Sequence, residues 1–114
     1  MLLKWTRFCL EVRDTYKPAA KNSELDMLLK YSKIDYLAID DFGIGARTDR
    51  ESVAALRLAF DLLDARYEKT GCTTDISTNW QPDELRQKFD DRIVRRIGEM
   101  TTVYVMSRKV RTRG

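Results

Sequence analysis

The chain has 114 residues, of which 43% are hydrophobic and 34% are charged, and its formal net charge is +3. This length allows one domain with its own core, although it is short for a complete nucleotide-binding sheet. No apolar stretch approaches the roughly 20 residues that a membrane-spanning helix needs. Lys4 and Arg7 interrupt the apolar start and no small-residue cleavage site follows, so we expect a cytoplasmic protein without a secretory signal.

Two cysteines, Cys9 and Cys72, are present, and the chain contains no histidine. Their spacing matches no CxxC motif, and without histidine a zinc site lacks its usual ligands. We therefore expect both cysteines to be buried thiols outside any disulfide, as is common in intracellular proteins.

Positive charge is concentrated at the carboxyl end. Between Ile93 and Gly114 six Lys and Arg residues stand against Glu99 alone, which gives this segment a net charge of +5 and the rest of the chain −2. Such a segment suits phosphate groups on a nucleotide, on nucleic acid or at a neighbouring subunit's active site. Alternatively, it is only a solvated basic tail.

Two helices are predicted before the first long apolar strand. Apolar residues recur at helical spacing from Trp5 to Tyr16, and Lys17-Pro18 ends this helix because proline disfavours a helical residue before it. Ser23 and Asp26 then form a capping pattern for a short helix that stops near Ser32. The apolar residues of these helices that we expect in the core are Trp5, Phe8, Val12, Tyr16, Leu25, Leu28 and Leu29.

A strand follows over residues 34–39, and after a turn with two glycines comes the longest predicted helix. Thr48 and Glu51 form a capping box at its start, and Gly71 ends it. Its apolar residues recur at steps of three and four, which predicts a core-facing stripe. That stripe consists of Val53, Leu56, Phe60, Leu63 and Tyr67.

The rest of the chain alternates strand and helix again. Residues 72–78 favour a strand, Gln81-Pro82 opens a helix that has an apolar face, and a break near Asp90-Asp91 divides that helix. Its face consists of Leu85, Phe89, Ile93 and Ile97. A last strand is predicted over residues 102–106, before the basic tail. Alternating strands and helices indicate an α/β domain with a parallel sheet.

Two adjacent carboxylates, Asp40 and Asp41, end the first long apolar strand, which is a Walker B pattern. In P-loop hydrolases the first acid holds Mg²⁺ and the second positions the attacking water, at the strand end where α/β sheets bind ligands. Alternatively, the two aspartates simply terminate a strand and face solvent. Two ionised groups this close repel each other and are costly to bury, which favours a metal-binding or polar role.

Three motifs in order resemble the carboxyl-terminal part of the AAA+ ATPase core in the DnaC family of replicative helicase loaders, with the IstB transposition helpers as close relatives. The motifs are residues 36–43 (YLAIDDFG), which resemble Walker B; residues 77–79 (STN), which resemble sensor 1; and residues 91–97 (DRIVRRI), which resemble the arginine-finger helix. The resemblance covers nearly the whole chain. It implies an incomplete P-loop NTPase sheet of about three parallel strands flanked by helices, forming one partial domain over residues 1–114 that runs from Walker B to the sensor 2 region.

The resemblance also implies roles for individual residues. Asp40 would hold Mg²⁺, Asp41 would act on the attacking water, and Asn79 would orient that water beside the γ-phosphate. Arg96, or else Arg92, would be the finger that enters a neighbouring subunit's site. From the residues alone, Asn79 is more simply a turn or N-cap residue. Arg92 and Arg96 equally fit a solvated basic stripe or i,i+4 pairs with nearby Asp or Glu.

A further residue, Arg111 in the basic tail, resembles the sensor 2 arginine of this family. ATP and Mg²⁺ are the ligands that the resemblance implies.

The chain departs from the family in one essential part. No Gly-Lys-Ser/Thr loop of the kind that cradles phosphates occurs in the sequence, so the Walker A element is absent. In the family, whose strand order is five, one, four, three, two, the Walker A strand would precede Met1, and the first residues here would belong to strand two. Loss of strand one leaves a gap, so the last strand either lacks a neighbour or shifts beside residues 72–78. Asp75 would then face water instead of being buried.

The resulting expectation is a truncated helicase-loader-like ATP-binding protein of DNA replication, with little or no ATPase activity alone. A second hypothesis is a binding module without catalysis that contacts single-stranded DNA or offers Arg96 to another AAA+ subunit. An IstB-type transposition helper and an interaction-only remnant are further alternatives. The partners expected are a replicative helicase or other AAA+ subunits, in an oligomer and without membrane contact.

Overall fold

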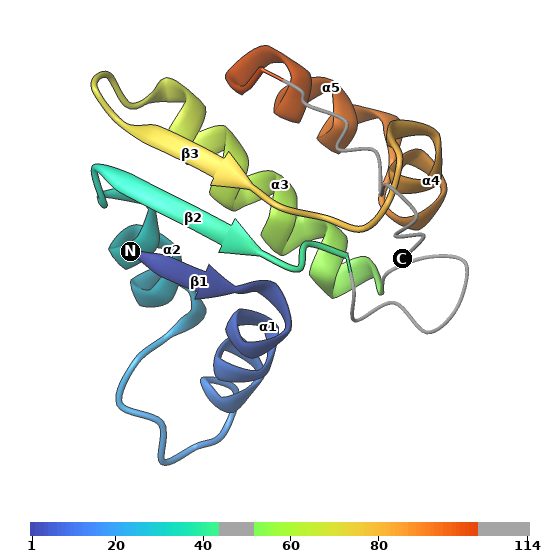
Figure 1. Cartoon of the computed structure of the whole chain (residues 1–114). Helices are drawn as coiled ribbons and strands as arrows, with labels where there is room; N and C mark the ends of the chain where they lie inside the picture. The colour runs from blue at the N-terminus through green and yellow to red at the C-terminus, as the bar shows by residue number, and fades with distance from the viewer. Residues whose placement is uncertain (44–51, 103–114) are drawn as a thin grey trace, which may run out of the picture.

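Three parallel strands form the sheet, in the order β1-β2-β3, and they alternate with helices along the chain. The computed structural model describes residues 1–43 and 52–102. The strands are β1 (Leu2–Lys4), β2 (Tyr36–Asp40) and β3 (Thr73–Ile76). The helices are α1 (Trp5–Asp14), α2 (Glu24–Ser32), α3 (Val53–Glu68), α4 (Pro82–Lys88) and α5 (Asp91–Met100). The predicted α/β architecture, with a parallel sheet of about three strands flanked by helices, is confirmed (Figure 1).

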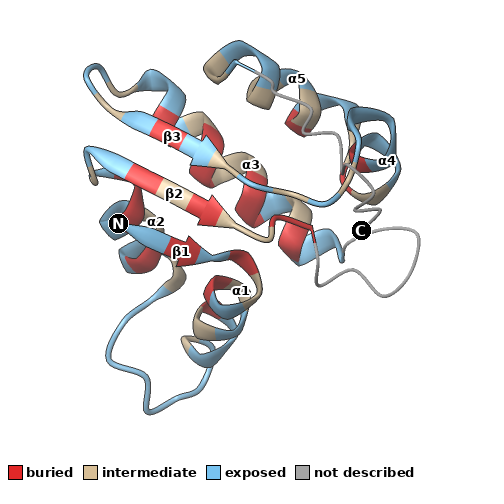
Figure 2. Ribbon diagram, viewed as in Figure 1, coloured by how far each residue is buried: buried red, intermediate tan, exposed pale blue. Residues whose placement is uncertain are grey.

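The register of the strands decides which side chains share a face of the sheet. Leu3 pairs with Ile39 and Leu37 pairs with Thr74, and all four of these side chains are buried. Because successive side chains of a strand alternate between faces, the residues next to these buried ones point to the opposite face. On that face Leu2 is 62% exposed and Tyr36 is 48% exposed. In Figure 2 buried and more exposed positions alternate along the strands accordingly.

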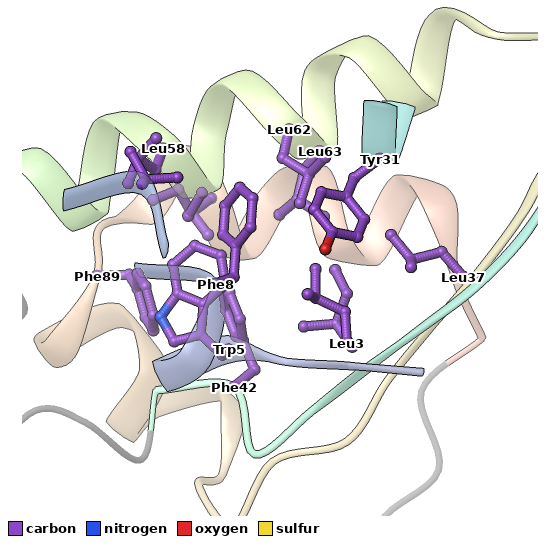
Figure 3. Packing of buried hydrophobic residues seen from close by; sticks show 14 of the residues in the cluster. Leu3, Trp5, Phe8, Tyr31, Leu37, Phe42, Leu58, Leu62, Leu63 and Phe89 are labelled. Atoms are coloured by element: carbon purple, nitrogen blue, oxygen red, sulfur yellow. The ribbon is translucent and has the colours of Figure 1, made fainter. Parts of the chain in front are cut away.

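The covered face of the sheet is the core of the protein. Aromatic rings dominate it where α1 meets the turn after β2: the ring centroids of Trp5 and Phe42 are 5.0 Å apart, and those of Phe8 and Tyr31 are 5.4 Å apart at 90°. Leu58, Leu62 and Leu63 of α3 close the core from above the sheet (Figure 3). Edge-to-face rings of this kind contribute about 0.5–1.5 kcal/mol each beyond the apolar area that they bury.

Helix boundaries follow the predicted signals where these are local. Ser23 caps α2, with its Oγ accepting from the Asp26 N–H at 3.1 Å and the Asp26 carboxylate accepting from the Ser23 N–H at 2.8 Å. The break near Asp90 is also confirmed, because Asp90 is the N-cap of α5 and accepts from the Ile93 N–H at 3.0 Å.

The predicted start of α3 was wrong, because its N-cap is Ser52, whose Oγ accepts from the Ala55 N–H at 3.1 Å. The proposed capping residues Thr48 and Glu51 lie outside the described residues.

The predicted core stripes were only partly correct. In α3 the buried residues are Ala55, Leu58, Ala59, Leu62, Leu63 and Arg66, whereas Val53 is 82% exposed and Tyr67 46% exposed. Of the predicted stripe only Leu63 is fully buried, whereas Leu56 and Phe60 are half-buried, and Phe60 and Tyr67 contact arginines of α5. Likewise Tyr16 and Leu25 are exposed, and Met27 and Tyr31 take the core positions of α2. Helical periodicity identifies apolar faces, but the packing of neighbouring elements decides which face is fully covered.

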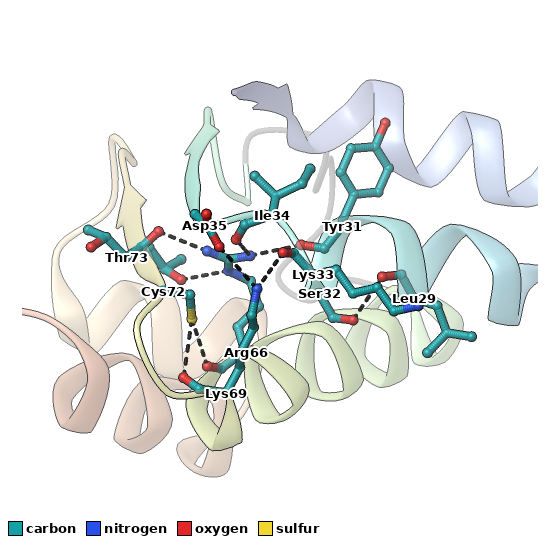
Figure 4. Close-up of polar contacts among 11 residues, drawn as sticks. Leu29, Tyr31, Ser32, Lys33, Ile34, Asp35, Arg66, Lys69, Cys72 and Thr73 are labelled. Carbon is teal, nitrogen blue, oxygen red and sulfur yellow. Dashed lines mark hydrogen bonds and ion pairs between the residues drawn. The ribbon is translucent and has the colours of Figure 1, made fainter.

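One charged side chain, Arg66, lies in the interior with only 1% of its surface exposed. Its guanidinium donates to the carbonyl oxygens of Tyr31, Ile34 and Thr73 at 2.7–2.8 Å, and its Nε donates to Thr74 Oγ1 at 2.7 Å (Figure 4). Burial lowers the pKa of Arg66, yet a guanidinium remains charged at neutral pH. Arg66 therefore ties the α2–β2 connection to β3 at the amino ends of these strands.

Both cysteines are reduced, but they are half-buried and not fully buried as predicted. The Cys72 thiol donates to the Arg66 carbonyl oxygen at 3.1 Å. Asp75 is exposed, as predicted, and accepts a hydrogen bond from the Tyr36 hydroxyl at 2.7 Å on the open face of the sheet.

Candidate functional site

The carboxyl ends of β2 and β3 meet at one edge of the sheet, and Asp40 and Ser77 lie there. Asp40 is the last residue of β2, and Ser77 directly follows β3. The Ser77 N–H donates to the Ile39 carbonyl oxygen at 2.9 Å, which continues the ladder, and the Ser77 Oγ donates to Asp40 Oδ1 at 2.6 Å. The bond to an ionised acceptor is short and strong, so it orients the carboxylate of Asp40.

Asp41 adopts a left-handed backbone conformation, with φ of 56°. This region is unfavourable for residues that have a Cβ, although aspartate tolerates it better than most. The Asp41 N–H donates to Ser77 Oγ at 3.3 Å, so Ser77 contacts both neighbouring aspartates. Backbone strain of this kind is concentrated at functional sites in proteins, which supports Asp41 as a site residue.

The turn after Asp41 is held against β3 and α4. The Phe42 N–H donates to the Ser77 carbonyl oxygen at 2.9 Å, and the Thr78 hydroxyl donates to the Phe42 carbonyl oxygen at 2.7 Å. Phe42 stacks on Phe89 with ring centroids 4.3 Å apart. The stacking of Phe42 on Phe89 thus supports the turn that follows Asp40 and Asp41.

Glycine is required at the next position. Gly43 has φ of 84°, and a Cβ there would lie 3.0 Å from the Phe89 ring and 3.1 Å from Trp80. The Trp80 Nε1 donates to the Gly43 carbonyl oxygen at 3.2 Å, and Lys88 Nζ lies 4.1 Å from the centre of the Trp80 ring. Sequence reasoning missed the contacts of Gly43, because Trp80 and Phe89 lie 37 or more positions from it in the sequence.

Asn79 is exposed and lines a broad groove with a volume of about 1890 Å³. The groove runs along β3 and is bounded by α4 and by the end of α5; its lining includes neither Asp40 nor Asp41. Ser77 borders the groove as well as contacting Asp40, so it links the predicted acidic pair to the predicted amide. Ser77 thus contacts both predicted acids, and Asn79 lies two residues beyond it, on the groove that neither acid lines.

The two predicted finger arginines lie on the side of α5 that faces α3, and they differ sharply. Arg96 is held by Asp64 at 2.9 Å and Glu99 at 3.2 Å, and its guanidinium lies 4.1 Å from the centre of the Tyr67 ring. Its side chain is only 21% exposed. The Arg92 side chain is 67% exposed, pairs with Asp90 at 3.5 Å and lies over the Phe60 ring. Arg92 is therefore the more accessible guanidinium of the two.

A third arginine of α5, Arg95, faces the groove that Asn79 lines. Its Nη2 pairs with Asp91 at 3.1 Å, and Asp91 also forms an ion pair with Arg86, whose Nε lies 3.3 Å away. Sequence reasoning passed over Arg95. Arg95 is adjacent to Arg96 in the motif, and neighbouring residues of a helix point to different sides. The sequence therefore already indicated that Arg95 and Arg96 face different parts of the protein.

The oxygen donors at the edge suit a hard cation. Asp40, Asp41 and Ser77 offer carboxylate and hydroxyl oxygens, the ligand type that Mg²⁺ prefers, and Mg²⁺ in nucleotide sites commonly takes only one or two protein carboxylates. Within residues 1–43 and 52–102, no three His, Cys, Asp or Glu side chains come together to form a larger metal cluster. Arg111 and residues 103–106 of the predicted last strand lie outside the described residues.

No family model matches the chain, and a search of curated proteins found none that is similar to it. Of the helices in the described part of the chain, none has the length and apolar character needed to cross a membrane.

Proposed function

We propose that this chain is the carboxyl-terminal part of a DnaC/IstB-like AAA+ ATPase core, from Walker B to the sensor 2 region. In this proposal, the edge of the sheet where Asp40, Asp41 and Ser77 lie binds a nucleoside triphosphate together with Mg²⁺. The observation that carries the proposal is the hydrogen bond between Ser77 and Asp40 at the ends of neighbouring parallel strands. In α/β sheets this edge is where ligands bind.

The order of the strands supports the same proposal. The resemblance implies that the first residues belong to strand two, that Asp40 ends strand three and that Asn79 follows strand four. Strands two, three and four are neighbours in the family, and β1, β2 and β3 are neighbours here, all parallel. A right-handed α/β arrangement of another family could share this order, so the site residues carry more weight than the topology.

Each residue has a defined role in this proposal. Asp40 would ligate Mg²⁺, and Asp41, held in its left-handed conformation, would polarise the attacking water together with Asn79. A bound Mg²⁺ would supply charge neutralisation at the phosphates. Because no Walker A loop is present to cradle the phosphates, we expect weak binding and little or no ATPase activity from this chain alone.

Arg92 is the better placed of the two arginines to act on a neighbouring subunit. Its exposed guanidinium could enter a second site with the loss of one long ion pair, to Asp90, and of its contact with the Phe60 ring. Arg96 would have to leave Asp64, Glu99 and the Tyr67 ring. This observation favours a second function as well, in which the chain offers Arg92 to a partner AAA+ subunit, such as that of a helicase-loading complex, without catalysis of its own.

The direct test is Mg²⁺-dependent binding of a fluorescent ATP analogue to the full chain. We expect weak binding that Asp40→Asn and Asp41→Asn both abolish. The control Asp14→Asn removes an exposed carboxylate of α1 and should bind like the unchanged chain. Equal binding by all four proteins would contradict the proposal. Turnover at the level of a complete ATPase, lost in Asp41→Asn, would instead contradict the expected lack of activity.

Binding to single-stranded DNA separates the binding module without catalysis from the nucleotide-binding protein. An affinity for single-stranded DNA that falls steeply as salt is raised would indicate phosphate contacts by the basic residues. If Arg92→Gln reduces stimulation of a partner ATPase while nucleotide binding stays unchanged, the chain acts through its arginine and not through its carboxylates.

A further inference from the structure

One face of the sheet is packed against helices, and the other is open within the described part of the chain. The connections from β1 to β2 and from β2 to β3 run in the same direction across the sheet. Right-handed crossovers of one direction place their helices on one face, and α2 and α3 accordingly contact each other. Leu3, Leu37 and Ile39 are buried beneath them. Figure 1 is viewed from the open face, with α3 behind the sheet.

The open face has an apolar centre. Leu2 of β1 pairs with Ala38 of β2, and Tyr36 lies on the same face, two residues before Ala38. Leu2 and Tyr36 are exposed, and Ala38 is half-buried. Parallel sheets occur almost only with both faces covered. A surface that buries these side chains would therefore complete the usual arrangement.

The charges on this face differ between its two outer strands. Lys4 lies on β1, and Asp75 lies on β3, and both are exposed. Asp40, on the middle strand, pairs in register with Lys4. The face is thus positive at one side and negative at the other, so it is complementary to a copy of itself that is turned over.

We propose that the open face binds the same face of a second copy of this chain, about a twofold axis that runs parallel to the strands above β2. This arrangement lays β1 of each copy over β3 of the other, so Lys4 lies near Asp75 of the second copy, twice. Asp75 is level with Leu2 in the register, two positions before Lys4. That offset is about 6.6 Å along the strand, which a lysine side chain can span.

The charges select this axis over the other possible one. An axis across the strands would lay β1 over β1 and would bring Lys4 near Lys4 and Asp75 near Asp75, which is unfavourable. With the axis along the strands, the two Asp40 side chains lie near the axis with a Lys4 on each side. Tyr36 and Ala38 then meet their own counterparts, as in any isologous interface.

This contact is independent of the proposed function. An arginine that enters a neighbouring subunit's site makes a heterologous contact, whereas the open face would make an isologous one. Three short strands offer less surface than the roughly 800 Å² per partner of a stable interface. We therefore expect a weak dimer that forms as the protein concentration is raised.

Sedimentation equilibrium of the full chain over a wide range of protein concentration tests the proposal. Lys4→Glu and Asp75→Lys each place like charges opposite one another, and each should raise the dimer dissociation constant at least about tenfold. A mixture of the two variants again opposes unlike charges at both contacts. It should associate at least about tenfold more tightly than either variant alone. Lys21→Glu and Asp14→Lys reverse exposed charges outside this face and should leave the dissociation constant unchanged.

Three outcomes would overturn the proposal. A chain that stays monomeric at every concentration would mean that another molecule, or another part of the chain, covers the face. Association that Lys4→Glu and Asp75→Lys leave intact would place the contact elsewhere. Failure of the mixed variants to associate, with both folded by circular dichroism, would exclude the pairing of β1 with β3. None of these readouts involves nucleotide, so the dimer can fail while Mg²⁺-dependent ATP binding persists, and the reverse.

Discussion

Ser77 donates its hydroxyl hydrogen to the carboxylate of Asp40 across the carboxyl ends of β3 and β2, with 2.6 Å between the two oxygens. The residues are 37 positions apart in the sequence, and the parallel pairing of Ile39 with Ile76 brings them together. The bond fixes a carboxylate that would otherwise rotate freely at the end of a strand. It is therefore the contact on which the candidate site depends.

The coupling between these two residues can be measured. We expect Ser77→Ala to destabilise the fold by about 1 kcal/mol, the usual net value of a hydrogen bond. In a double-mutant cycle with Asp40→Ala, the two effects should fail to add, with a coupling energy of about 1 kcal/mol. Urea unfolding of the four proteins gives the result, and additive effects would show that the bond contributes nothing to stability.

The left-handed conformation of Asp41 leads to a stability gain on substitution. Asp41→Gly should stabilise the fold by up to about 1 kcal/mol, because glycine adopts positive φ without strain. Asp41→Ala should instead destabilise it, since alanine lacks the polar side chain that makes this region tolerable. Thermal unfolding of both variants is the measurement. A loss of stability with glycine would contradict the assignment of strain to this position.

Gly43 and Gly71 share positive φ but differ in their surroundings. None of the described residues comes within 4 Å of a Cβ added to Gly71, so Gly71→Ala should cost about 1 kcal/mol through the backbone alone. Gly43→Ala meets the Phe89 ring at 3.0 Å as well, and we expect it to cost at least about 1 kcal/mol more. Denaturant midpoints of the two variants provide the comparison. Equal losses would mean that Phe89 and Trp80 move aside.

Removal of the buried guanidinium should be severe. Arg66→Met leaves the carbonyl oxygens of Tyr31, Ile34 and Thr73 without this donor, and we expect a loss of about 3–5 kcal/mol or failure to fold. Arg66→Lys should retain part of the stability, because it keeps a donor of nearly the same length. Arg7→Met, at an exposed position of α1, is the matched control and should change stability by less than about 0.5 kcal/mol. Circular dichroism during urea unfolding distinguishes these results.

A pH dependence follows from Glu24. Hydrogen bonds from Arg57, at 2.6 and 3.0 Å, hold the pKa of Glu24 below its usual 4.5. A carboxyl whose pKa is lowered by folding stabilises the native state above its unfolded pKa, and that contribution is lost as the pH falls through the folded pKa.

Glu24→Gln should therefore cost about 0.5–1 kcal/mol at neutral pH, since Arg57 is half-exposed, and the difference should vanish in acid below the folded pKa. Stability of the two proteins measured by urea unfolding across this range is the test. Glu68→Gln, at an exposed position that ends α3, controls for the loss of a surface charge. A difference that persists in acid would contradict the assignment to the ion pair with Arg57.

The sequence alone predicted strands β2 and β3, the helices of the described residues and several of their ends. The capping box of Ser23 and Asp26 and the N-cap at Asp90 were predictable because the atoms involved are three residues apart and bond within a single helical turn. Strand-ending acids at Asp40 and Asp41 were equally visible, and the alternation of strands and helices gave the parallel sheet.

Only the tertiary structure decided which faces and side chains these elements use. The interior position of Arg66 depends on partners in other elements. So do the contacts of α3 with α5 and the difference in exposure between Arg92 and Arg96. The same holds for Ser77, whose contact with Asp40 crosses two strands. Local patterns fix hydrogen bonds within a turn of helix, whereas burial and charge pairing arise from contacts between segments far apart in sequence, which periodicity does not encode.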